Sequence, residues 1–221
     1  MHFPALFQFL EGLAENNVRP WFLHNKPQYD ILNEEFQIFT GEVAGEVAKF
    51  VPEMAGFEVK KAVYRIYRDV RFAKDKTPYK THFGACLPAR KTADPAQPIY
   101  YFHFDQKRTL LIAAGIYMPD DVVLKKIRNH IATEPKVFSK LLKNKALNET
   151  FGGLSTEGRM VRLPKGFTTD LPHSDFIKNR HFICETTVDL SKRIPKDLSK
   201  EIAKTFKAAL PLCDWLRQAA R

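Results

Sequence analysis

The hydrophobic period of this chain changes near Gly56, and that change limits the possible folds more than any other feature. Before Gly56, apolar side chains recur every three or four residues, as they do along the buried face of an amphipathic helix. After it, apolar and polar residues alternate, which is typical of a strand with one buried face. Because helical patterns return later, the sequence predicts an α+β fold, an antiparallel meander sheet of four to six strands packed against N-terminal and C-terminal helices.

No linker-like stretch divides the 221 residues, so we expect a single domain over 1–221. In chain order, the predicted parts are N-terminal helices over 3–53, a sheet over 57–117, helices over 119–147, a loop and strand region over 148–189 and a C-terminal helix over 195–219. The strands expected in the sheet cover 57–71, 82–88, 99–105 and 109–117, with 182–189 as a returning strand.

Two helix ends lead to specific predictions. Asn25, with Gln28 three residues later, resembles a capping box, so its side chain is expected to cap the long second helix. Pro211 is expected to kink the C-terminal helix, because proline removes a backbone hydrogen bond.

Positive charge is concentrated in one part of the chain. The whole sequence carries 35 Lys and Arg against 25 Asp and Glu, a net charge of +10. Between Lys60 and Lys91, ten basic residues stand against only Asp69 and Asp75, which gives a local net charge of +8. Such a concentration attracts phosphates, carboxylates or an acidic partner surface.

The segment from Arg65 to Lys80, RIYRDVRFAKDKTPYK, combines this charge with aromatic residues. If it forms a strand, its polar face continues through His82, Tyr101 and His103 on neighbouring strands, and small residues between them leave room for a small-ligand pocket. A second basic turn, RLPKGF, is expected to face the same pocket. The residues predicted to bind a small anionic ligand are Arg65, Arg68, Arg71, Asp75, Lys76, Tyr79, Lys80, Arg162 and Lys165.

The sequence does not decide whether the protein is an enzyme. If it is, Asp69 or His103 is the expected general base and Tyr67 or Tyr79 the proton donor, while the cations stabilise developing negative charge. No P-loop, dinucleotide fingerprint or nucleophile elbow occurs, and no His, Cys and carboxylate residues have the spacing of known metal sites. We therefore expect no cofactor and no bound metal.

The same residues have plainer interpretations. Arg65 and Asp69 can form an ordinary surface ion pair, the lysines can form a solvated face, and His82 and His103 can be structural. Two other functions also fit: a nucleic-acid-binding module, because cations alternate with aromatic residues, and an interaction protein whose basic loop docks an acidic partner. Burial of Arg65 and Asp69 in a cleft would favour the ligand pocket, and their exposure would favour docking.

Cysteine usage and hydropathy bear on location. The longest apolar stretches fall well short of the roughly 20 residues of a membrane span, so no membrane partner is expected. Cys86, Cys184 and Cys213 are widely spaced among apolar neighbours, which suits a reducing compartment. We expect a cytoplasmic protein, and the sequence sets no oligomeric state.

Several motifs together resemble a known family. The motifs are RIYRDVRFAKDKTPYK, the upstream NN-x(3)-WF-x(2)-NK, the YYFHF strand, G-x-Y-x-P and RLPKGF, in order from about residue 5 to 188. This pattern is similar to the domain of unknown function 2461 family of bacterial and fungal hypothetical proteins. The resemblance implies an α+β fold and an intracellular setting, and it supplies no reaction, cofactor or catalytic residue.

Overall fold

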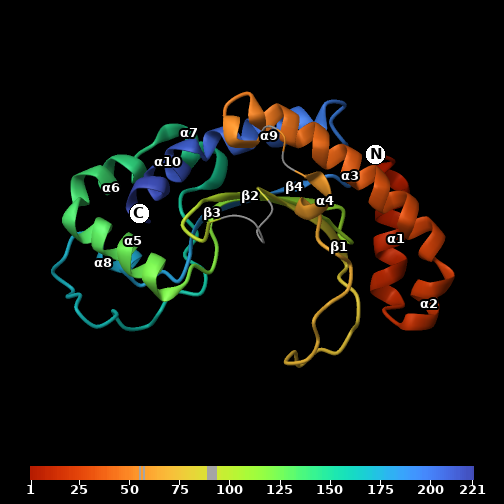
Figure 1. Ribbon diagram of the computed structural model, residues 1–221, viewed down its shortest axis with the longest axis horizontal. Helices are drawn as coiled ribbons and strands as arrows, with labels where there is room; N and C mark the ends of the chain where they lie inside the picture. Colours follow the sequence, from red (N-terminus) through yellow and green to blue (C-terminus); the bar gives the residue numbers. More distant parts are fainter. Residues whose placement is uncertain (55, 57, 89–93) are drawn as a thin grey trace. The chain divides into compact units, whose positions relative to one another are not determined.

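The computed structural model describes residues 1–54, 56, 58–88 and 94–221, and within them it has the predicted α+β fold (Figure 1). Four antiparallel strands form one sheet in the order β1-β2-β3-β4. The strands are β1 His82–Leu87, β2 Ile99–Asp105, β3 Thr109–Ile116 and β4 Phe182–Asp189. The helices are α1 Phe3–Glu15, α2 Arg19–His24, α3 Lys26–Ala48, the 3₁₀-helix η1 Pro52–Met54, α4 Val59–Ala62, α5 Asp121–Thr133, α6 Pro135–Leu142, α7 Lys145–Phe151, α8 Ser174–Ile177, α9 Leu198–Ala208 and α10 Leu210–Ala219.

The chain divides into two compact units, each built from three separate stretches of sequence. The first unit comprises Met1–Lys91, Tyr101–Ile112 and Thr187–Ala203. The second comprises Thr92–Tyr100, Ala113–Thr186 and Lys204–Arg221. The boundary between them falls within β2, β3 and β4.

The core of the first unit is aromatic. Phe102 and Phe104 on β2 are fully buried. The ring of Phe36 on α3 packs against both, with centroid distances of 5.8 Å to Phe102 and 6.2 Å to Phe104, and against Phe83 of β1 at 5.6 Å. Tyr101 and His103 alternate with Phe102 and Phe104 and are only partly buried, on the opposite face of the strand. The period-two pattern of this strand is therefore confirmed, and it leaves a polar face on the side away from the phenylalanines.

The second unit has a core of its own, in which Trp215 of α10 lies between Phe138 of α6 and Phe182 of β4. The ring centroid of Trp215 lies 4.9 Å from that of Phe138 and 6.5 Å from that of Phe182. At the start of β4, the backbones of β3 and β4 come unusually close. A Cβ at Gly115 on β3 would lie 2.2 Å from the carbonyl oxygen of Phe182, and Gly115 has φ +126°. Only glycine fits this position.

The prediction of a strand over 57–71 is wrong. Val59–Ala62 forms the short helix α4, and Phe57 lies outside the described residues, as do Arg90 and Lys91 of the basic region. Residues 63–81, which we call the arm, then run out from α4 and return into β1 (Figure 1). The fourth strand of the sheet is instead β4, the predicted returning strand.

The arm is extended but pairs mainly with itself. Isolated antiparallel bridges join Val63 to Ala85 and Tyr67 to Tyr79. The backbone N–H of Arg68 donates to the carbonyl of Pro78 at 2.9 Å, and that of Lys80 donates to Ile66 at 2.8 Å. An extended backbone gives the period of two whether or not a ladder forms, which explains the error.

The predicted capping box is also wrong. The Asn25 side chain donates to the carbonyl of Trp21 at 2.9 Å and so caps the C-terminal end of α2. It makes no side-chain bond to the first turn of α3. At the other end of the chain, Pro211 separates two helices, because it occupies the first turn of α10, where its missing N–H is not needed.

Candidate functional site

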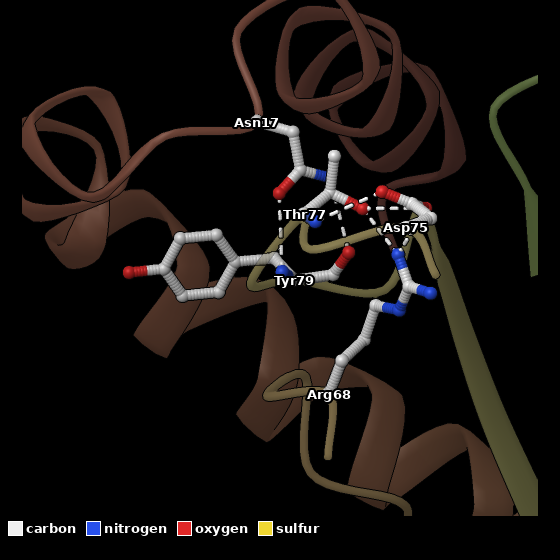
Figure 2. Close-up of polar contacts among 5 residues, drawn as sticks. All are labelled: Asn17, Arg68, Asp75, Thr77 and Tyr79. Atoms are coloured by element: carbon white, nitrogen blue, oxygen red, sulfur yellow. Dashed lines mark hydrogen bonds and ion pairs between the residues drawn. The ribbon is translucent and has the colours of Figure 1, made fainter. Parts of the chain in front are cut away.

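Hydrogen bonds among three side chains, Arg68, Asp75 and Thr77, fix the shape of the arm (Figure 2). The Asp75 carboxylate accepts hydrogen bonds from the Thr77 N–H and hydroxyl, both at 2.9 Å, and from the Arg68 guanidinium at 2.5 Å. Arg68 also donates to the Thr77 hydroxyl. The Thr77 N–H, and then Arg68, lower the pKa of Asp75 to about 2. Arg68 and Asp75 are thus already bonded to each other within the arm.

A second contact ties the arm to the turn between α1 and α2. Figure 2 shows the Asn17 amide reaching the backbone of Tyr79, whose N–H donates to Asn17 Oδ1 at 3.1 Å while its carbonyl accepts from Nδ2 at 3.0 Å. The Tyr79 ring is 4% exposed and stacks on Phe22 of α2 with 4.1 Å between centroids. Burial raises the pKa of Tyr79. Tyr79 therefore lies in the core and anchors the arm.

Most of the remaining charges of the arm are bonded within the arm. Arg71 forms a two-point ion pair with Asp69, at 3.0 and 2.7 Å, and this pair lowers the pKa of Asp69 to about 2. Lys76 donates to the carbonyl of Val70 at 2.9 Å. These charged groups are exposed. Arg65 is exposed as well, and Tyr67 is 47% exposed. An exposed carboxylate held by a guanidinium is a weak base, so the environment of Asp69 does not suit proton abstraction.

Lys80, at the base of the arm, is in a different environment. Its ammonium group donates to the backbone carbonyl of Arg65 at 2.7 Å and lies 5.2 Å from the ring centroid of Tyr64. Burial, and then the positive charge of Arg65, lower the pKa of Lys80. Neither Lys80 nor Arg65 forms an ion pair with a carboxylate of the described residues.

The polar face of β1 and β2 continues from Lys80. His82 and His103 lie with ring centroids 4.9 Å apart, and the Tyr101 hydroxyl is 3.0 Å from Nδ1 of His103. Gly84 makes room for this arrangement, since a Cβ there would come within 2.9 Å of the Tyr101 oxygen. We call Tyr64, Lys80, His82, Tyr101 and His103 the basal cluster.

Burial keeps both imidazoles of the basal cluster uncharged at neutral pH. It lowers the pKa of His103, and together with His103 and Lys80 it lowers the pKa of His82 to about 4. Neutral imidazoles can both donate and accept hydrogen bonds. Tyr101 lies on the face predicted from the alternation of the YYFHF string, although it was not among the residues predicted to bind the ligand.

The other predicted site residues lie in the second unit. Arg162 and Lys165 are exposed on the loop between α7 and α8. Their proposed role beside the arm stays a prediction.

The described part of the chain contains no group of three or more His, Cys, Asp or Glu side chains placed to hold a metal ion. The three cysteines, Cys86, Cys184 and Cys213, are buried. None of the described helices is both long enough and apolar enough to cross a membrane.

Comparison with known proteins gives one match. A search of curated proteins and a search of solved structures each return none. The family model described as "Conserved hypothetical protein (DUF2461)" matches residues 5–215, nearly the whole chain. The chain therefore belongs to this family.

Proposed function

We propose that the protein binds a small phosphorylated or carboxylated ligand at the basal cluster, with Arg65 as a second cation nearby. The observation that carries the proposal is the ammonium group of Lys80, which is half-buried and has no carboxylate partner among the described residues. Removing an ammonium group from water without a counter-charge is unfavourable. A bound anion would remove that penalty.

The neighbours of Lys80 suit an anionic guest. Phenol and imidazole groups from Tyr101, His82 and His103 supply hydrogen bonds without adding negative charge of their own. Charge-assisted hydrogen bonds to a phosphate or carboxylate are stronger than those between neutral groups. Arg68, Arg71 and Lys76 contribute to the shape of the arm in this proposal, because each is already bonded within it.

If the ligand is chemically changed, His103 is the proposed acid–base group. This role requires the tautomer in which Nδ1–H donates to the Tyr101 hydroxyl oxygen, because Nε2 then carries the lone pair. Nε2 has no hydrogen-bond partner among the described residues. Its lowered pKa favours the neutral form that can accept a proton. Asp69 and Tyr67 lie on the exposed arm, where Asp69 is held by Arg71.

Ligand-dependent thermal shifts over a panel of phosphorylated and carboxylated metabolites test the proposal. Lys80→Gln removes the central cation, and Lys74→Gln removes an equal charge from an exposed position of the same arm. We expect a ligand that stabilises the wild type and the Lys74 variant but not the Lys80 variant. Equal shifts in the two variants would refute the basal site, and circular dichroism checks that both variants fold.

A second candidate function is the docking of an acidic partner protein by the tip of the arm. Phe72 is 95% exposed, and the guanidinium carbon of Arg71 lies 5.9 Å from its ring centroid. Arg65 and Asp69 are exposed as well, which favours an open surface for this part of the arm. Binding of a labelled acidic peptide that is lost in Phe72→Ser supports docking. Peptide binding that Phe72→Ser retains refutes docking. Tighter binding of a single-stranded oligonucleotide than of the peptide, with an affinity that falls steeply as salt rises, indicates a nucleic-acid function instead.

We also propose a cytoplasmic location, supported by the wide spacing and burial of the three cysteines. Cell fractionation that places the protein outside the cytoplasm would contradict it.

A further inference from the structure

Two arginines in the second unit converge on one buried asparagine. Asn179 is 1% exposed. Arg128 of α5 donates from Nη2 to its backbone carbonyl at 2.9 Å. Arg159, on the loop between α7 and α8, donates from Nε to its side-chain oxygen at 2.6 Å. A single neutral residue thus positions both guanidinium groups.

Neither guanidinium is neutralised by this arrangement. Arg128 is 8% exposed, and its Nη2 also lies 3.3 Å from the sulfur of Met160. Among the described residues, its buried Nε has no hydrogen-bond partner. Arg159 lies 4.8 Å over the ring centroid of Phe176. In the portion of the chain that the structure describes, neither arginine has a carboxylate within ion-pair distance. Asp175, whose charge interacts with Arg159 at longer range, is bonded to Lys178 at 2.8 Å.

A third positive charge, that of Arg180, acts on the Arg128 guanidinium. Burial lowers the pKa of Arg128, Asp121 opposes this effect, and the neighbouring charge of Arg180 lowers the pKa further. Arg180 follows Asn179 directly and is exposed. His181, next in the chain, is 8% exposed, and its buried Nδ1 has no hydrogen-bond partner in the described part of the chain. Positive charge without an ion-pair partner and unsatisfied polar atoms therefore gather around residues 179–181.

Such an arrangement is unfavourable in an empty protein and favourable around an anion. A guanidinium withdrawn from water without a counter-charge is costly, and a buried nitrogen without a partner adds to that cost. Planar guanidinium groups match the oxygens of a phosphoryl group in pairs. Three cations suit a doubly charged phosphoryl group better than a single carboxylate, because more of their charge is neutralised.

We propose that Arg128, Arg159 and Arg180, the arginine cluster, bind the phosphoryl group of a phosphate monoester or of pyrophosphate. The site is independent of the basal cluster, whose residues belong to the first unit. The loop that carries Arg159 also carries Arg162 and Lys165, the basic turn noted in the sequence, so further cations follow along the same segment.

Isothermal titration with pyrophosphate tests the proposal, with sulfate as a comparison anion. Arg159→Gln and Arg180→Gln each remove one cation at a partly buried or exposed position, and Arg193→Gln removes one from an exposed loop elsewhere. We expect each cluster variant to bind pyrophosphate about tenfold more weakly or worse, and Arg193→Gln to match the wild type. Wild type that binds no pyrophosphate at millimolar concentration overturns the inference.

The same titration separates this site from the basal cluster. Lys80→Gln keeps the arginine cluster and is expected to retain pyrophosphate binding. Loss of binding in Lys80→Gln, with binding intact in Arg159→Gln, would assign the anion to the basal cluster and overturn the present inference alone. Arg159→Gln that melts at a lower temperature but keeps its pyrophosphate affinity would show a purely structural arginine, which also overturns it.

Discussion

Asn17→Ala removes the side chain that joins the arm to the turn between α1 and α2. Asn17 makes two hydrogen bonds to the backbone of Tyr79, at 3.0 and 3.1 Å, across 62 residues of sequence. Each bond is partly buried and contributes about 0.5–1.5 kcal/mol, so the substitution costs about 1–3 kcal/mol. The stacking of Tyr79 on Phe22 remains, so we expect the arm to open more often rather than to detach.

Limited proteolysis with trypsin measures this opening, because Arg71, Lys74 and Lys76 are exposed on the arm. When opening and closing are fast, the cleavage rate follows the open population. A cost of 1–3 kcal/mol raises that population roughly 5- to 150-fold, since every 1.4 kcal/mol is a factor of ten. The fragments, identified by mass spectrometry, should arise from cuts within residues 65–80.

Two neighbouring substitutions control the experiment. Asn17→Asp keeps the acceptor for the Tyr79 N–H but loses the donor to its carbonyl, so cleavage should rise less than in Asn17→Ala. Asn16→Ala removes a bond to Gly12 at the end of α1 and leaves the arm contact intact, so cleavage of the arm should not change. Wild-type cleavage rates and an unchanged melting temperature in Asn17→Ala would refute the anchoring role of this residue.

Two further predictions concern stability. Gly115→Ala should destabilise the protein by about 3 kcal/mol or more, since φ is +126° and the Cβ would meet the Phe182 backbone. Gly45→Ala in α3 should stabilise it by about 0.5–1 kcal/mol, because no atom of the described residues lies within 4 Å of the added Cβ. Denaturant titration that ranks the two variants the other way would contradict both expectations. His82 takes up a proton near pH 6.5 when unfolded and near pH 4 when folded, so the free energy of unfolding should fall as pH drops through that window. Between pH 7 and pH 5, the free energy of unfolding of His82→Gln should fall by up to about 2 kcal/mol less than that of the wild type. Urea titrations that give both proteins the same pH dependence would count against a buried neutral imidazole.

Patterns with one strong physical cause were readable from the sequence. The alternation of β2 is enforced by a sheet with one apolar face, so burial of Phe102 and Phe104 and the shared face of Tyr101 and His103 followed from spacing alone. The proline break was also predictable in position, though Pro211 starts a new helix rather than bending one.

The sequence did not indicate which of two nearby partners a polar side chain bonds. Arg68 could pair with Asp69 or Asp75, and the structure pairs it with Asp75 because the arm turns back at that point. The side chain of Asn25 had two helix ends within reach and bonds the earlier one. Neither choice changes the hydrophobic pattern.

One signal in the sequence was overlooked. Arg128 lies four residues after Leu124 on the buried stripe of α5, where a charged residue needs a reason to be present. An arginine at a core-facing helical position marks a partner or ligand that the hydrophobic pattern alone does not explain.

The discontinuous make-up of the two units governs how the protein can be dissected. Because each unit draws on three stretches of the chain, no single truncation isolates either one, and a cut after residue 112 would leave both without part of their sequence. Assigning an activity to one half by expressing fragments is therefore ruled out. Point substitutions in the full-length chain are the appropriate genetic tool.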